Sequence, residues 1–207
     1  MHNQENKISQ YKDKWINVQF NAIEKEEDFY LFTTLHNDKD DYYINIGHLG
    51  IKYEGSSQWK IIDFEIDRQY RGQNYGAAML VEALEGVTKL SNTQNIYLYG
   101  EISSVYIEDR NNYMDINESL GYKKLKMFYQ KLGFTFEDDI NFYKHTSVEA
   151  VPDWQQVMKY SMEIEELKVE IAFKDIILEA YEKSRYQMQS SFLGRLLLKK
   201  FEDKKVR

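Results

Sequence analysis

The chain has 207 residues, of which 43% are hydrophobic and 29% charged, and its formal net charge is −7. This length and composition can bury a full hydrophobic core, which excludes a wholly disordered protein. The absence of cysteine excludes disulfide scaffolds, thiolate zinc sites and a cysteine nucleophile. The acidic balance leaves no basic footprint for nucleic acid, and the four histidines lack metal-ligand spacing. The polar N-terminus and the lack of about 20 consecutive apolar residues predict a cytoplasmic protein without a membrane span.

The single proline, Pro152, marks a change of sequence pattern. Before it, β-like and helical segments alternate; after it, the pattern is helical and glycine is absent until Gly194. We therefore predict a domain over 1–150 and a helical extension over 151–207. The domain is expected to fold without residues 153–207.

The first half of this domain is rich in β-branched and aromatic residues, which favour strands. Strands are predicted at 15–23, 42–54 and 58–67, and a Gly-Ser-Ser turn joins the last two as an antiparallel hairpin. Residues 26–37 are ambiguous and have room for a short helix.

The second half alternates helices with strands. Gly133 follows the second helix and suits a left-handed C-cap. Strands followed by helix, strand, helix and strand predict a mixed α/β, or α+β, domain. The helices are predicted at 74–90 and 118–132, and the strands at 95–102, 135–136 and 140–145.

A loop rich in glycine and amide residues lies between the strand 58–67 and the helix 74–90. Backbone N–H groups at such a helix start have no intrahelical acceptor, so the loop predicts a phosphate or pyrophosphate site. Arg71 would add a full positive charge, and Gly72 and Gly76 would let the backbone approach the anion closely. The loop matches neither a Walker A motif nor a dinucleotide fingerprint, so an ordinary strand–helix turn is an equal interpretation of the loop alone.

A second motif, Phe-Tyr-Gln-Lys-Leu-Gly-Phe at 128–134, ends the next helix. The loop Tyr-Arg-Gly-Gln-Asn-Tyr-Gly at 70–76 followed by this motif, with one strand between them, resembles the GNAT superfamily of acyl-CoA N-acyltransferases. The resemblance implies a mostly antiparallel central sheet with a V-shaped splay, flanked by helices. It also implies an acetyl-CoA-dependent N-acetyltransferase, in which a primary amine attacks the thioester directly in a ternary complex.

The resemblance further implies roles for individual residues. The pantetheine arm of acetyl-CoA would lie in the V and hydrogen-bond the strand edge near Phe64 and Ile66, where an amide would polarise the thioester carbonyl. Tyr129 stands where the family tyrosine protonates the leaving thiolate, and a phenol with a pKa of about 10 suits that role. The residues implied to hold the pyrophosphate are Arg71, Gly72, Gln73, Asn74, Tyr75 and Gly76.

The chain departs from the family pattern at three places. Asn74 stands where glycine is usual, but asparagine tolerates a left-handed backbone, so the loop can still close. Tyr122 stands where the family often has asparagine. The polar segment 103–119 is longer than usual and is a candidate for substrate recognition.

The general base is not fixed by the pattern. Direct attack needs a neutral amine, so a carboxylate, or water leading to one, should reach the V. Glu101 is the favoured candidate because it ends the strand beside the V, while Asp63 and Glu65 share one face of the preceding strand. A solvated strand carboxylate is the alternative for each, and simple packing against the sheet is the alternative for Tyr129.

The extension has apolar residues at spacings of three and four. This pattern predicts a coiled coil, formed by one long helix or by a hairpin broken near 189–191. Acidic residues dominate 153–182 and basic residues dominate 183–207. Docking on the same domain or on a second subunit, as a homodimer through these helices, is favoured over binding to a membrane surface or an anionic partner.

Two other classes of function compete with the enzyme. One is a non-catalytic acyl-CoA-binding module whose helices recruit a partner or a membrane surface, and the other is a nucleotide-binding regulatory domain that rests on the loop alone. The overall acidity favours a cationic amine as acceptor. Thioester turnover and acyl-CoA affinity, measured together, separate these classes.

Overall fold

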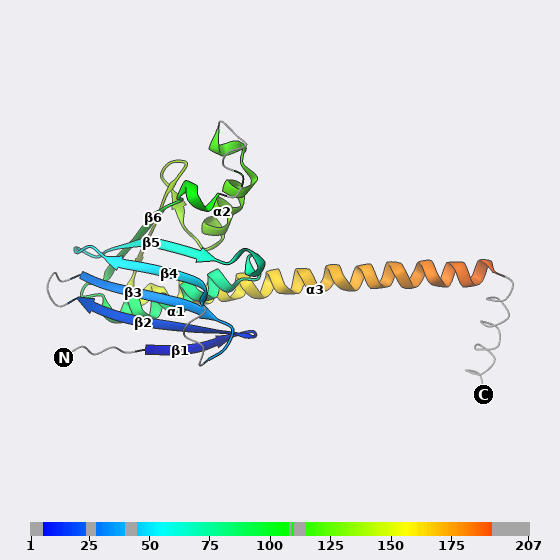
Figure 1. Cartoon of the computed structure of the whole chain (residues 1–207), viewed down its shortest axis with the longest axis horizontal. Coiled ribbons are helices and arrows are strands. Elements are labelled where there is room, and N and C mark those ends of the chain that lie inside the picture. Colours follow the sequence, from blue (N-terminus) through cyan, green and yellow to red (C-terminus); the bar gives the residue numbers. More distant parts are fainter. Residues whose placement is uncertain (1–5, 24–27, 40–44, 108, 110–114, 192–207) are drawn as a thin grey trace. The chain divides into compact units, whose positions relative to one another are not determined.

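The computed structural model describes residues 6–23, 28–39, 45–107, 109 and 115–191. The chain divides into two compact units between Met162 and Glu163. The strands and α-helices follow one another along the chain as in Figure 1: β1 (Asn6–Tyr11), β2 (Lys14–Ile23), β3 (Asp28–His36), β4 (Asn45–Tyr53), β5 (Gln58–Ile66), α1 (Tyr75–Leu90), β6 (Asn95–Glu101), α2 (Leu120–Lys131), β7 (Thr135–Phe136), β8 (Asn141–Ser147) and α3 (Val151–Ser190).

The strands of the described residues form one eight-stranded sheet in the order β1-β2-β3-β4-β5-β6-β8-β7. Neighbouring strands are antiparallel except β5 and β6, which are parallel. A parallel pair needs a crossover, and α1 supplies it. The predicted mixed α/β fold with a mostly antiparallel sheet is confirmed.

The sheet opens where β5 and β6 diverge. Their pairing ends with Ile61 opposite Gly100. Beyond this point β5 stays paired with β4, while the chain after β6 follows the β8 side, where the Ile102 N–H donates to the Ile140 carbonyl at 2.9 Å. This divergence is the V-shaped splay that the family resemblance implies.

A β-bulge lies at the same place. Gly50 of β4 pairs with Asp63 of β5, but the next β4 residue, Ile51, pairs with Ile61. Ile62 is therefore an extra residue of β5, and such an insertion bends and twists its strand locally. The bulge accounts for the turn of β5 away from β6 one residue after their pairing ends.

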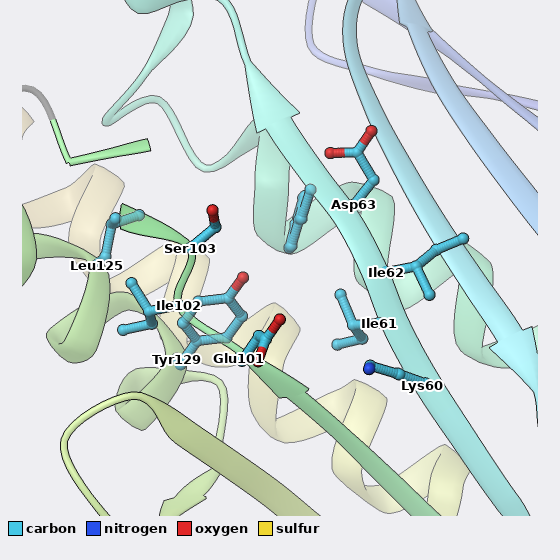
Figure 2. Close-up of a pocket in the computed structure, with 10 residues that line it drawn as sticks. Lys60, Ile61, Ile62, Asp63, Glu101, Ile102, Ser103, Leu125 and Tyr129 are labelled. Carbon is cyan, nitrogen blue, oxygen red and sulfur yellow. The ribbon is translucent and has the colours of Figure 1, made fainter. Parts of the chain in front are cut away.

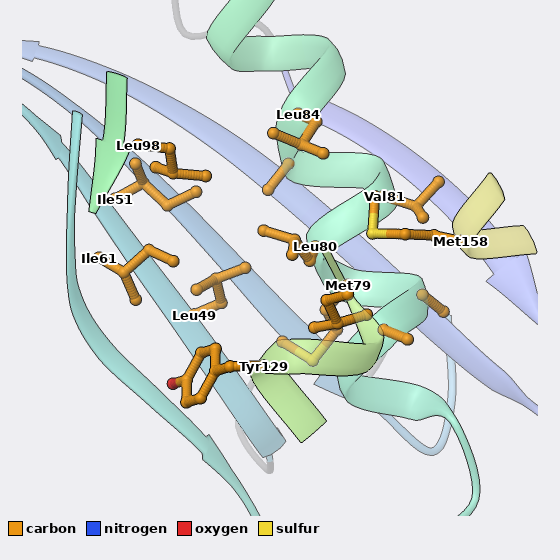
Figure 3. Packing of buried hydrophobic residues seen from close by; sticks show 14 of the residues in the cluster. Leu49, Ile51, Ile61, Met79, Leu80, Val81, Leu84, Leu98, Tyr129 and Met158 are labelled. Carbon is orange, nitrogen blue, oxygen red and sulfur yellow. The ribbon is translucent and has the colours of Figure 1, made fainter. Parts of the chain in front are cut away.

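The hydrophobic core lies between α1 and one face of the sheet (Figure 3). The helix carries small residues among its large apolar ones, so it can approach the strands closely. Each fully buried Leu or Ile side chain contributes about 1.5–3 kcal/mol relative to an exposed one. The fully buried side chains of this layer include Leu49, Ile51, Met79, Leu80, Leu84 and Leu98.

Two strands differ from the sequence-based expectation. The ambiguous segment 26–37 contains β3, in which Leu31, Thr33 and Leu35 alternate into the core at 0–1% exposure, so the short helix is wrong. β1 was not predicted because its sequence is polar. It is an edge strand that Lys7 attaches to the glutamates of α1 by ion pairs, and its Tyr11 meets Tyr75 of α1 edge-on.

α3 is a single helix that ends at Ser190, at the expected break near 189–191, and the second arm of the hairpin alternative falls in residues 192–207, outside the described residues. Its first turns belong to the core of the first unit, because Val151, Trp154, Met158 and Met162 are buried. The division between the units consequently falls after Met162, beyond the expected boundary at 150. In the part of the chain that the structure describes, no helix is long and apolar enough to cross a membrane.

Candidate active site

A pocket of about 250 Å³ lies where β5 and β6 diverge (Figure 2). Three of the site residues expected from the sequence, Phe64, Glu101 and Tyr129, come from three different elements and line this one pocket. The full lining comprises Lys60, Ile61, Ile62, Asp63 and Phe64 of β5, Glu101 of β6, Ile102 and Ser103 after it, and Leu125 and Tyr129 of α2.

Tyr129 both packs in the core and reaches the pocket. Its side chain is 7% exposed, and its ring stacks on Phe142 with the ring centroids 3.9 Å apart. Phe64 and Phe134 contact the same ring edge-on. The hydroxyl is turned toward β5 (Figures 2 and 3). The packing interpretation and the catalytic interpretation of Tyr129 are therefore compatible.

The edge of β5 that faces the pocket carries backbone groups available to a ligand. The Asp67 N–H donates to the Ile46 carbonyl at 2.9 Å, so residue 67 directs its backbone toward β4. Because alternate residues of a strand point to opposite edges, Phe64 and Ile66 direct their backbone groups into the V. The Ile66 carbonyl indeed accepts a hydrogen bond from Arg71 Nε at 2.7 Å on that side.

The loop between β5 and α1 has a left-handed backbone at Gly72 (φ 77°) and at Asn74 (φ 67°). Asn74 is the N-cap of α1, but its side chain donates to the Met162 carbonyl at 3.2 Å instead of capping the helix. The Ala78 N–H donates to the Asn74 carbonyl and is the first intrahelical donor, so the N–H groups of residues 75–77 have no intrahelical acceptor. These N–H groups are placed for an anion.

The two glycines of the loop have different surroundings. A Cβ at Gly72 would meet no heavy atom within 4 Å, so this position is open to a ligand. A Cβ at Gly76 would lie 3.1 Å from Phe128 Cζ and 3.4 Å from Phe64 Cζ. The missing side chain at Gly76 therefore makes room for the aromatic rings of α2 and β5. Access for an anion, the reason expected for that glycine, stays a prediction beside this packing reason.

Two cations lie beside the loop. Arg71 contacts β5, where its guanidinium also lies 3.6 Å from Glu65 Oε1. Lys12, in the turn between β1 and β2, donates to the Gln73 carbonyl at 3.1 Å. Sequence reasoning missed Lys12 because the β1–β2 hairpin that brings it to the loop was not predicted.

The same turn anchors the start of α1. The Tyr75 hydroxyl donates to Asp13 Oδ1 at 2.6 Å, and Lys14 Nζ donates to Asp13 Oδ2 at 2.5 Å. The hydrogen bond from Lys14, and next that from Tyr75, lowers the pKa of Asp13 to about 2. Burial, and next the hydrogen bond to Asp13, raises the pKa of Tyr75 to about 12. The Tyr75 side chain therefore holds the loop in place, which leaves its backbone N–H for a ligand.

The three candidate carboxylates lie in different environments. Glu101 is exposed at the mouth of the pocket. Asp63 lines the pocket and forms a hydrogen-bonded pair with His48 Nε2 at 2.7 Å. Glu65 lies beside Arg71 and outside the pocket lining. The His48–Asp63 pair escaped sequence reasoning because it depends on the register between β4 and β5.

The other departures from the family pattern have structural roles or lie partly outside the described residues. Tyr122 is buried, and its hydroxyl donates to the Asp139 carbonyl, so it supports the fold. The candidate recognition segment 103–119 includes residues 108 and 110–114, which lie outside the described residues. Its described parts include two short 3-10 helices.

No protein-family model and no curated protein sequence matches this chain. Solved structures do match it, at low sequence identity. A protein described as an acetyltransferase of the GNAT family from Desulfovibrio desulfuricans is 17% identical, with 57% of this chain and 69% of that chain covered and a TM-score of 0.40. A GNAT-family acetyltransferase from Staphylococcus aureus Mu50 is also 17% identical, with 56% and 67% covered and a TM-score of 0.39.

A third structure, described as a streptothricin acetyltransferase from Bacillus anthracis in complex with acetyl coenzyme A, is 15% identical. It covers 67% of this chain and 92% of its own, with a TM-score of 0.37. These structures carry the name of the superfamily, or of the activity, that the two sequence motifs indicate.

Proposed function

We propose that this protein is an acyl-CoA-dependent N-acyltransferase that transfers an acetyl group from acetyl-CoA to a primary amine. One observation carries the proposal: a single pocket in the V is bordered by the open edge of β5, by Tyr129 and by two carboxylates. The candidate anion-binding loop follows β5 a few residues along the chain, so one extended ligand could reach both the loop and the pocket.

The residues present fit acetyl-CoA along its length. The pyrophosphate would bind the N–H groups of the loop 71–76, beside Arg71 and Lys12. The pantetheine arm would pair with the backbone of Phe64 and Ile66. Arg71 would release the Ile66 carbonyl in this step, and its guanidinium would turn to the phosphates.

The proposed reaction follows from the groups around the pocket. The neutral amine nitrogen attacks the thioester carbon, and a β5 amide stabilises the oxyanion. The carbon–sulfur bond then breaks, and the thiolate takes the proton of the Tyr129 hydroxyl. The proton of the amine passes to a carboxylate at the pocket, so the products are an N-acetyl amide and CoA.

Acetyl-CoA is expected to protect the first unit against unfolding. A ligand that binds only the native state adds about 2.7 kcal/mol of stability at a hundredfold excess over its dissociation constant. Thermal unfolding with acetyl-CoA, and with acetyl-pantetheine as the shorter ligand that lacks the pyrophosphate and the nucleotide, measures this effect. A larger shift with acetyl-CoA is expected because only this ligand reaches the loop.

The same samples test turnover. Release of free thiol from acetyl-CoA in the presence of a panel of primary amines is the expected result. No stabilisation by any CoA thioester would contradict the proposal as a whole. Stabilisation without thiol release from any amine would instead favour a non-catalytic acyl-CoA-binding module.

Glu101 is proposed as the general base, and Asp63 with His48 is the competing proton acceptor. Glu101→Gln is expected to lower the turnover number by about 10²-fold at neutral pH, with a smaller loss at high pH where the amine is already neutral. Asp63→Asn is the matched variant, because it removes the other carboxylate of the pocket. A large loss confined to Asp63→Asn would transfer the role to the His48–Asp63 pair.

A further inference from the structure

The second compact unit contains a long helical segment, residues 163–190 of α3, with a regular apolar stripe. The stripe repeats at alternating spacings of three and four, which is the a/d pattern of a coiled coil. The apolar members of this stripe are each more than half exposed. We call the stripe the heptad seam, and its members are Ile164, Leu167, Ile171, Lys174, Leu178, Tyr181, Arg185 and Met188.

The helix that carries the heptad seam needs a partner to cover its exposed apolar side chains. In the described part of the second unit, residues 163–191, the chain contains no element besides this helix. A solitary helix in water gains little stability from its own hydrogen bonds, and an exposed apolar stripe promotes association. The seam spans about three and a half heptads, which is the length at which such a pattern indicates a coiled coil.

We propose that the partner is the heptad seam of a second copy of this chain, in an antiparallel coiled coil. A second copy is favoured because both helices then share the same repeat and length. The orientation follows from the two cations in the seam. A parallel, in-register pair would place Lys174 opposite Lys174 and Arg185 opposite Arg185, and like charges at facing positions destabilise the interface.

The antiparallel pair replaces these repulsions by complementary contacts. With its centre at residue 176, Ile164 faces Met188 of the second copy, and Arg185 faces Leu167. Glu163 and Glu170 lie beside Leu167 on one edge of the seam, so Arg185 comes near two carboxylates.

Lys174 fits the same register. It faces Leu178 of the second copy, and Asp175 and Glu182 lie beside that leucine on one edge of the seam. Within its own helix Lys174 already pairs with Glu170 at 2.6 Å, so its charge is partly neutralised at the edge of the seam. Both seam cations thus lie near carboxylates when the helices run in opposite directions.

The orientation is tested by disulfide formation in the full chain, which has no cysteine of its own. Ile164→Cys and Met188→Cys are made as separate variants and oxidised singly and as a mixture. A disulfide needs Cα atoms about 4.4–6.8 Å apart. In the antiparallel pair two copies of residue 164 are separated by about 36 Å along the axis. A covalent dimer is therefore expected from the mixture alone.

Other cross-linking results would overturn the proposal. Efficient dimers from each single variant would show a parallel pair, and no dimer under any condition would show that the seams do not meet in this register. Cross-linking is read by mass on a denaturing gel with and without reductant.

The role of the heptad seam as the dimer interface is tested by sedimentation of the full chain. Ile171→Glu places a charge in the seam and is expected to raise the dimer dissociation constant by at least about 100-fold. Val169→Glu is the matched control, because Val169 is 71% exposed and helical geometry places it away from the seam.

The control is expected to leave the dimer unchanged, and both variants should keep the unfolding transition of the first unit. A wild-type monomer at every concentration would refute the homodimer and leave docking on the same chain or on another partner. A dimer lost only in Val169→Glu would show that a different helix face is used.

Discussion

Replacing Tyr129 with phenylalanine is expected to lower the turnover number by about 10²–10⁴-fold, the usual loss when a positioned acid is removed. The stability of the protein and its affinity for acetyl-CoA should change little. The reason is that the ring packs against Phe142, Phe64 and Phe134, and phenylalanine keeps those contacts. Only the hydroxyl turned toward the pocket is lost. Rapid-mixing measurements under conditions where chemistry limits the rate give the turnover number.

Tyr122→Phe is the matched control, since this tyrosine lies in the same helix and its hydroxyl bonds the Asp139 carbonyl. Loss of that hydrogen bond is expected to lower the free energy of unfolding by about 1 kcal/mol and to leave turnover unchanged. The two variants therefore separate a chemical role from a structural one. A Tyr129→Phe enzyme with full turnover would assign Tyr129 to packing alone.

Much of the fold was predictable because its strands and helices have regular patterns of apolar residues. The helix α1, the hairpin of β4 and β5 and the left-handed cap at Gly133 (φ 87°) all follow from local sequence. β1 was missed because its largely polar sequence gives no strand signal, although the ion pairs of Lys7 and the ring of Tyr11 attach it to α1. The alternation in β3 supports a strand, but its position between β2 and β4 depends on tertiary contacts that local sequence does not give.

In the candidate site, too, some residues could be predicted from local sequence and others could not. Two motifs 50 to 60 residues apart identify Tyr129 and the loop, and the parallel arrangement of β5 and β6 then brings Glu101 to the same pocket. The contacts of Lys12 and the His48–Asp63 pair depend on strand register, which local patterns leave open. The role of Gly76 could not be predicted because it depends on the aromatic rings packed against the helix.

The first turns of α3 contribute buried side chains to the core of the first unit. A chain ending at residue 152 is expected to be unfolded or severely destabilised, whereas a chain ending at residue 162 should fold. This differs from the expectation, drawn from sequence pattern, that the domain folds without residues 153–207. The difference arises because Trp154, Met158 and Met162 are buried in the first unit.

Trp154 is the main anchor among these residues. Its Nε1 donates to the Leu132 carbonyl at 2.6 Å, and its ring meets Phe134 edge-on with centroids 5.6 Å apart. In the next position, Gln155 Nε2 donates to the Val81 carbonyl at 2.6 Å. Trp154→Ala alone is expected to cost about 3–5 kcal/mol, the usual range for removing a buried tryptophan.

Single domains have a free energy of unfolding of about 5–15 kcal/mol. Losing all the buried side chains at the start of α3 would therefore remove most of it. Urea unfolding of the full chain, the chain ending at 162, the chain ending at 152 and Trp154→Ala measures each contribution. The chain ending at 162 should keep its unfolding midpoint and acetyl-CoA protection but sediment as a monomer, because it lacks the heptad seam. Equal midpoints for the chains ending at 152 and 162 would show that the start of α3 adds no stability, and would restore the boundary near Pro152.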